Sequence, residues 1–101
     1  MSPALGFLVT LHAKSGREDD VVAFLKTAEG LVHAEPGTRH WFGFRIDATT
    51  FGIFDTFDTE PDRETHLNGE VRKALEANAD LFDKPPVIAP VDLVGVKAGS
   101  Q

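Results

Sequence analysis

The sequence predicts an α+β domain of the ferredoxin-like class, with the element order βαββααβ. Along 101 residues the hydrophobic period switches from two residues to about 3.6 residues and back, twice. Strands and helices in this order fit a four-stranded antiparallel sheet with the helices on one face. The length leaves room for one domain. We therefore expect a single domain over residues 1–101 with its core between residues 5 and 97.

The first strand and helix have clear signals. Apolar residues alternate along residues 5–13, which predicts a strand with one strongly apolar face. Ser15 and Glu18 have the spacing of a capping box at the start of a helix. Helical spacing of apolar residues then continues to about residue 34, and Pro36-Gly37 ends it.

Two further strands are predicted over residues 38–47 and 50–57, joined by a tight turn. In the first of them one face carries His40, Phe42, Phe44 and Ile46, and the other carries Arg39, Trp41, Gly43 and Arg45. We expect the face with the phenylalanines to line the space between the sheet and the helices.

The second half contains two helices and a last strand. Thr59 can cap a helix that runs to Leu67, with Pro61 in its first turn and Asn68-Gly69 as a left-handed stop. A helix over residues 70–82 follows. The last strand is predicted over residues 87–97. Because proline donates no ladder hydrogen bond, this strand should lie at an edge of the sheet or begin after Pro90.

The sheet face without helices predicts a homodimer. If the faces are assigned as above, that face carries Leu8, Trp41 and Phe54. A bare apolar face is usually an interface, and a two-fold pair of identical chains is the commonest way to cover it.

Composition excludes several function classes. The formal net charge of −6 and the scattered basic residues argue against nucleic acid and anionic membrane surfaces as partners. There is no cysteine, so disulfides, thiolate catalysis and cysteine-based metal sites are ruled out. No apolar run has the length of a membrane span, and the first residues lack a basic signal-peptide region. We expect a cytoplasmic protein.

Three short motifs, in this order and spacing, resemble the antibiotic biosynthesis monooxygenase family. They are the turn Glu35-Pro36-Gly37-Thr38, the strand from Phe51 to Phe57 with its Asp55, and the pair His66-Leu67. The resemblance spans residues 5–97. It implies a dimeric α+β barrel, in which two four-stranded sheets pack across a two-fold axis with the helices outside.

The resemblance also implies an activity, the cofactor-independent oxygenation of a small quinol or polycyclic phenol. In such chemistry the deprotonated substrate itself donates electrons to oxygen, so no cofactor and no metal are expected. The sequence departs from the family pattern where Trp41 replaces a tyrosine, Asp55 a glutamate and Phe57 a tryptophan. Because the asparagine and tryptophan of the haem-degrading branch are missing, haem is not the expected substrate.

His66 and Asp55 are the candidate catalytic residues. His66 can remove a phenolic proton as a general base or act as the oxyanion partner, or it can be a structural residue near the Asn68-Gly69 turn. Asp55 lies among apolar residues, so its carboxylate needs a partner, either Arg39, Arg45 or a backbone donor. A structural ion pair is the alternative interpretation.

The candidate substrate-binding residues are His40, Trp41, Phe42 and Phe44, which would shape a pocket for a small aromatic molecule. A structural role for His40 and packing at the dimer interface for Trp41 are the alternatives. The four histidines are too dispersed along the chain for a shared metal site. The other function class left open is a non-catalytic, small-molecule-binding or stress-associated dimer of the same fold.

Overall fold

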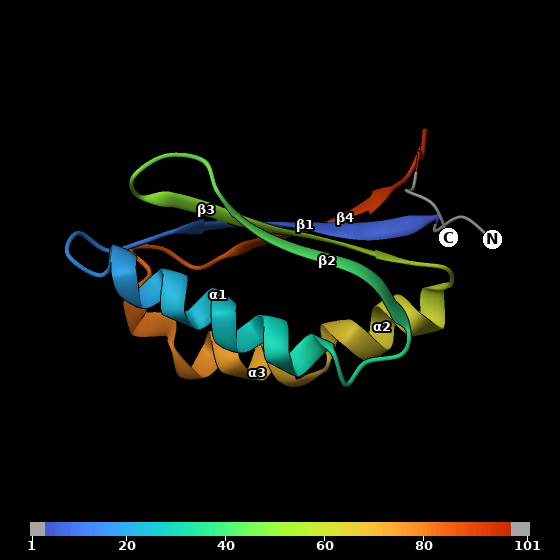
Figure 1. Ribbon diagram of the computed structural model, residues 1–101, viewed down its shortest axis with the longest axis horizontal. Coiled ribbons are helices and arrows are strands. Elements are labelled where there is room, and N and C mark those ends of the chain that lie inside the picture. The colour runs from blue at the N-terminus through green and yellow to red at the C-terminus, as the bar shows by residue number, and fades with distance from the viewer. Residues whose placement is uncertain (1–3, 98–101) are drawn as a thin grey trace.

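The computed structural model, which describes residues 4–97, contains a four-stranded antiparallel sheet with helices on one face (Figure 1). Its strands are β1 (Leu5–His12), β2 (Thr38–Arg45), β3 (Thr50–Phe57) and β4 (Val87–Asp92), in the order β2-β3-β1-β4. The helices are α1 (Glu18–Val32), α2 (Glu60–Leu67) and α3 (Glu70–Ala77), and the short 3₁₀ turn η1 (Ala79–Leu81) follows α3. The predicted ferredoxin-like class and element order are confirmed.

The core lies between the sheet and the helices. Alternate residues of β1 and β3 point into it and pair across the strands, as Val9 does with Ile53 and Leu11 with Phe51. Phe24 from α1 and Leu75 from α3 pack against them. Each such side chain stabilises the fold by roughly 1.5–3 kcal/mol on full burial. Packing in this core fixes the position of β3 against the helices, and with it the position of Asp55.

The prediction of which face of β2 meets the helices is wrong. The register pairs Trp41 with Asp55, and Phe42 with Phe54. Trp41 therefore lies on the helix side, where it packs against the core. His40, Phe42 and Phe44 lie on the uncovered face. Both faces of β2 carry aromatic side chains, so hydrophobicity alone does not decide which one turns inward.

The uncovered face is nevertheless apolar. Figure 1 shows no helix on this side of the sheet. Leu8 of β1, Phe42 of β2 and Val87 of β4 are 42%, 55% and 58% exposed there. The register places Leu8 opposite Phe54 and Ala89, and Phe54 opposite Phe42, so an apolar row crosses all four strands.

Several element ends differ from the predictions for local reasons. α1 begins at Glu18 after Arg17, and Ser15 does not cap it; instead Gly16, at φ +88°, makes a turn in the left-handed region. β4 ends at Asp92, whose register partner Leu5 is the first residue of β1.

The helical segment after α2 is also shorter than predicted. α3 ends at Ala77, where the Asn78 side chain donates to the Ala74 carbonyl and η1 replaces the last turn. The predicted left-handed stop at Asn68-Gly69 is absent, since both residues have negative φ and the chain passes through extended backbone at Gly69 into α3. No helix within residues 4–97 is long and apolar enough to cross a bilayer.

Candidate functional site

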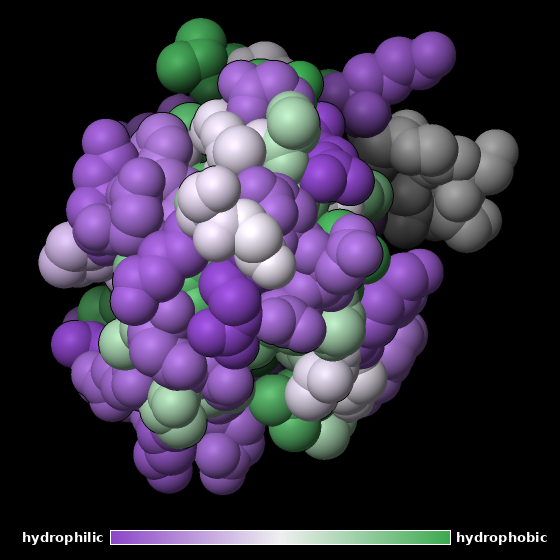
Figure 2. All heavy atoms as spheres, turned by 90° about the vertical axis from the view of Figure 1, so that its left-hand side faces the viewer, coloured by the Kyte–Doolittle hydropathy of each residue, from purple (hydrophilic) through white to green (hydrophobic). Residues whose placement is uncertain are grey.

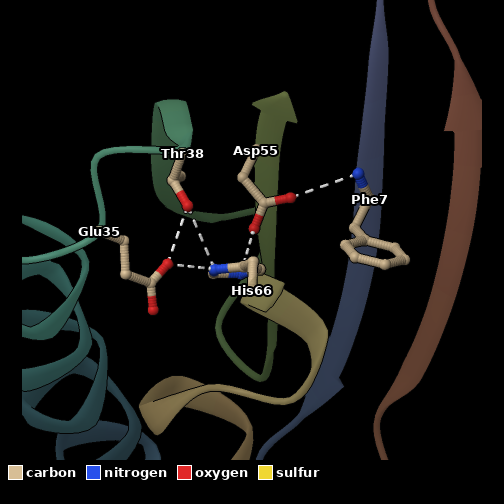
Figure 3. A network of polar contacts seen from close by, with 5 residues as sticks. All are labelled: Phe7, Glu35, Thr38, Asp55 and His66. Carbon is tan, nitrogen blue, oxygen red and sulfur yellow. Dashed lines mark hydrogen bonds and ion pairs between the residues drawn. The ribbon is translucent and has the colours of Figure 1, made fainter. Parts of the chain in front are cut away.

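Three segments that are distant in the sequence meet at His66. β3 carries Asp55 on its inward face, and the last turn of α2 carries His66. The turn between α1 and β2 carries Glu35, and Thr38 is the first residue of β2. Figure 3 shows the imidazole between the two carboxylates, with Thr38 beside Glu35. The turn approaches α2 closely because Gly37 has no side chain; a Cβ there would lie 2.7 Å from the Asp62 carboxylate.

Both ring nitrogens of His66 have a carboxylate partner. Nδ1 lies 2.5 Å from Glu35 Oε1, and Nε2 lies 2.9 Å from Asp55 Oδ2. The Thr38 hydroxyl donates to the same Glu35 oxygen at 2.8 Å. When the ring holds both protons, each N–H donates to a carboxylate, which is the strong, charge-assisted form of hydrogen bond.

Asp55 is 1% exposed and each of its oxygens has a donor. Oδ1 accepts from the backbone N–H of Phe7 at 3.2 Å, and Oδ2 faces His66. The predicted backbone donor is thus confirmed, whereas neither predicted arginine is a partner. Arg39 pairs with Asp58 at 2.7 Å, and Arg45 donates to carbonyls of the turn that follows β2.

The pKa of His66 is raised above the ordinary histidine value. Burial alone lowers it, but the hydrogen bonds to Asp55 and Glu35, together with the negative charge of both carboxylates, outweigh that effect. The protonated imidazolium form of His66 is therefore favoured, so its ring is less available to accept a proton from a substrate.

A small crevice gives access to this network. Phe7 and Phe57 lie against the His66 ring, with ring centroids 6.4 Å and 5.2 Å away. Asp55 and His66 both line a crevice of about 20 Å³ between the sheet and α3. A single water needs roughly 10–15 Å³ of such space. The crevice therefore holds one water or one hydroxyl group, but it is too small for an aromatic ring.

A larger groove adjoins the crevice. It has a volume of about 600 Å³ and lies between α3 with η1 on one side and the segment from Phe82 to Ile88 on the other. Arg72, Leu75 and Ile88 line both the crevice and the groove. The two spaces therefore meet at these side chains.

The predicted substrate-binding residues lie elsewhere. Trp41, Phe42 and Phe44 line a separate groove of about 420 Å³ along the edge strand β2, which neither His66 nor Asp55 reaches. His40 stacks on Phe42 and bonds to the Thr56 hydroxyl at 3.0 Å. The structure thus brings His66 and Asp55 together. Trp41 lies opposite Asp55 on the neighbouring strand but lines the other groove, and His40, Phe42 and Phe44 lie on the uncovered face.

Glu35 is the site residue that the sequence analysis missed. The sequence shows it only as part of the Glu-Pro-Gly turn, although a glutamate in a turn directly before a strand can reach a neighbouring helix end. Within residues 4–97, no group of three histidine or acidic side chains is arranged to hold a metal ion. In the network itself the two carboxylates flank opposite nitrogens of one ring, so they share no coordination point.

Comparison with known proteins adds the family context. No family model and no curated protein matches the chain. A solved structure of a protein of unknown function from Nitrosomonas europaea is 41% identical, covers 98% of this chain and 97% of its own, and superposes with a TM-score of 0.93. The chain belongs to the same family as that protein.

More distant structures identify the fold. A candidate antibiotic biosynthesis monooxygenase from Caulobacter crescentus is 18% identical over 92% of both chains, with a TM-score of 0.79. Another, from Chloroflexus aurantiacus, is 19% identical over 94% of this chain and 97% of its own, with a TM-score of 0.72. This protein has the antibiotic biosynthesis monooxygenase fold. The resemblance drawn from the sequence motifs is confirmed at the level of the fold.

Within the antibiotic biosynthesis monooxygenase fold, the motifs behind that resemblance converge in space. The Glu35 turn, the Asp55 strand and His66 form one hydrogen-bonded network, although they are 11 to 31 residues apart in the chain. A buried, charged network beside a crevice is the kind of place where perturbed acids and bases serve chemistry.

Proposed function

We propose that this protein is a cofactor-independent monooxygenase acting on a small quinol or polycyclic phenol. The observation that carries the proposal is the Glu35–His66–Asp55 network, buried between sheet and helices and open to a crevice the size of one hydroxyl group. The fold shared with candidate monooxygenases supports the reaction class but not the substrate.

The geometry favours a specific division of roles. The substrate hydroxyl enters the crevice while its rings stay in the adjoining groove. Asp55 accepts the phenolic proton, and the positively charged His66 then faces the phenolate oxygen and stabilises it. Glu35, with Thr38 on its oxygen, holds the ring of His66 and keeps it protonated.

The redox step needs only the substrate and dioxygen. A naphthohydroquinone anion passes electrons from its ring to oxygen, and one oxygen atom forms a bond to a ring carbon. The other oxygen leaves as water, so one hydroquinone and one dioxygen give one hydroxynaphthoquinone and one water. The substrate loses four electrons and dioxygen gains four. No other oxidant or reductant enters this balance.

The test is oxygen uptake with a panel of naphthohydroquinones and anthrones in buffer free of metal and flavin. Product mass after reaction with heavy-isotope oxygen separates ring oxygenation from simple autoxidation, which yields the unsubstituted quinone and hydrogen peroxide. We expect Asp55→Asn to lose about 100-fold or more in rate, the usual size of a general-base contribution. Asp92→Asn, at an exposed carboxylate in β4, is the matched control and should keep full activity.

A second candidate function is a non-catalytic, small-molecule-binding dimer. It is favoured by one observation, that both nitrogens of His66 are occupied by carboxylates, as in a purely structural ion network. It predicts no oxygenated product from any member of the panel, with ligand binding at most.

We further propose that a second copy of the chain covers the uncovered sheet face. The apolar row that crosses all four strands supports it, with Phe42 and Leu8 exposed on a face that no helix protects. This arrangement leaves the crevice and its groove on the helix side, away from the interface.

A further inference from the structure

We infer that the groove beside the crevice binds an aromatic substrate that carries a carboxylate, and that Lys14 and Lys84 hold that carboxylate. The inference rests on the proposed function for the end of the molecule at Asp55, but the anion site itself can be tested by binding alone. It assigns a substrate class and two specificity residues to a surface that sequence analysis did not single out.

The crevice at His66 and the larger groove lie next to each other, which suits an elongated ligand. Arg72, Leu75 and Ile88 belong to both, so a ligand whose hydroxyl enters the crevice has its rings in the groove. Lys14 and Lys84 line the groove but not the crevice. They therefore lie at the part of the groove that is away from Asp55, where a substituent opposite the hydroxyl would be.

Much of the wall between these two ends is apolar. Leu75 and Phe82 are buried, and Pro85, Pro86 and Ile88 belong to the same apolar part of the lining. Proline and phenylalanine side chains offer flat, rigid surfaces against which an aromatic ring packs without losing much side-chain freedom. Apolar walls with a few polar groups at defined points are typical of small-molecule sites.

The charges in the groove favour an anion. Of its three cations, Arg72 already pairs with Glu76 at 3.6 Å. None of the ion pairs within residues 4–97 uses Lys14 or Lys84. The acidic group that remains in the lining is Asp83. Two uncommitted lysines in one groove stand out on a chain with a net charge of −6.

Figure 2 views the end of the molecule where the β2–β3 turn and the start of α1 lie, and it shows a mainly hydrophilic surface with small apolar areas between the polar side chains. Lys14 belongs to this end, because its backbone N–H bonds to the carbonyl of Leu81 in η1, and Ala13 pairs with Phe82. These backbone bonds fix Lys14 against the segment that carries Phe82 and Lys84.

The test compares two probes under anaerobic conditions, so that no turnover occurs. One is a naphthoate whose hydroxyl lies at the opposite end of the ring system, and the other is the matching naphthol without the carboxylate. Calorimetry gives both affinities, and backbone amide NMR shifts locate the site. We expect the naphthoate to bind more tightly and to shift amides of Lys14, Ala79 and Lys84.

The double variant Lys14→Gln/Lys84→Gln should weaken naphthoate binding by about fivefold or more, the effect of a partly exposed ion pair, and leave naphthol binding unchanged. Lys73→Gln, on α3 but outside the groove lining, is the matched control and should bind both probes like wild type.

Equal affinity for the two probes, or an unchanged affinity in the double variant, would overturn the inference. So would shifts confined to Gly43 and Arg45, since these line the groove at β2 instead. Failure of the proposed function gives a different pattern, because naphthoate would then still bind at the lysines while no hydroquinone is oxygenated.

Discussion

His66 owes its charge state to two residues that lie far from it in the sequence. Its ring is 8% exposed, and Asp55 is 1% exposed, so neither could be ionised here alone without a large desolvation penalty. Together with Glu35 they form a network in which each charge is next to an opposite one. Replacing His66, the central cation, leaves the two carboxylates without their partner. The stability of such a variant therefore tests the network.

His66→Gln should destabilise the protein by about 3 kcal/mol, the usual result of breaking a buried ion pair on one side. The loss should depend on pH with a defined sign. Because the folded-state pKa of His66 is raised, its stabilising effect is complete below the ordinary histidine pKa and is lost as pH rises through the folded-state value. The difference in free energy of unfolding between wild type and variant should therefore shrink toward alkaline pH. Urea denaturation at a series of pH values measures it.

His33→Gln is the control for this experiment, since it removes an exposed imidazole that contacts neither carboxylate. Its stability should follow that of wild type at every pH. A difference for His66→Gln that grows with rising pH would contradict the assignment of a stabilised imidazolium.

The sequence identified two of the three members of this network. Asp55 stands out because strand alternation places a carboxylate among Phe51, Ile53 and Phe57. His66 stands out as an ionisable group at a helix end. The contact between Asp55 and His66, and the contact of Glu35 with His66, could not be predicted. The sequence of a turn does not show which distant helix its side chains will contact.

At the scale of the element, α2 depends on a short-range signal. The Thr59 hydroxyl accepts from the Asp62 backbone N–H at 3.3 Å and donates to the Asp62 carboxylate at 2.9 Å. Both partners lie three residues apart, so this cap could be predicted from the sequence. The other two predicted helix ends were wrong, because Ser15 makes no cap hydrogen bond to α1, and Asn68 and Gly69 have negative φ at the end of α2.

Thr59→Ala should destabilise the protein by about 1 kcal/mol, the usual loss for a helix cap. Because α2 carries His66, we also expect faster amide hydrogen exchange along Glu60–Leu67 than in wild type. Thr59→Ser keeps the hydroxyl and should restore most of the stability. If the serine and alanine variants were equally destabilised, the hydroxyl would not be the cap.

At the scale of the whole molecule, the sequence predicts the layers but not which way the edge strand faces. Strand periodicity correctly separates His40, Phe42 and Phe44 from Trp41 and Gly43. Which set meets the helices follows from the register with β3, and that register is set by Asp55 and Ile53 facing inward. The reversed assignment placed His40, Phe42 and Phe44 in a pocket between the sheet and the helices, whereas these side chains lie on the uncovered face, away from His66.

The corrected faces strengthen the case for a dimer, because the uncovered side gains Phe42 and Phe44 in place of Trp41. Phe42→Asp puts a charge at the β2 end of the apolar row, beside Phe54, and in a two-fold pair the change occurs twice. We expect it to raise the dissociation constant of the dimer by about 30-fold or more, as for the loss of an aromatic interface anchor. Ala77→Asp, at an exposed position of α3 on the opposite layer, should leave association unchanged. Sedimentation velocity over a range of protein concentrations measures both. If wild type sediments as a single chain at micromolar concentration, no second copy covers this face, and its exposed Phe42 and Leu8 need another partner.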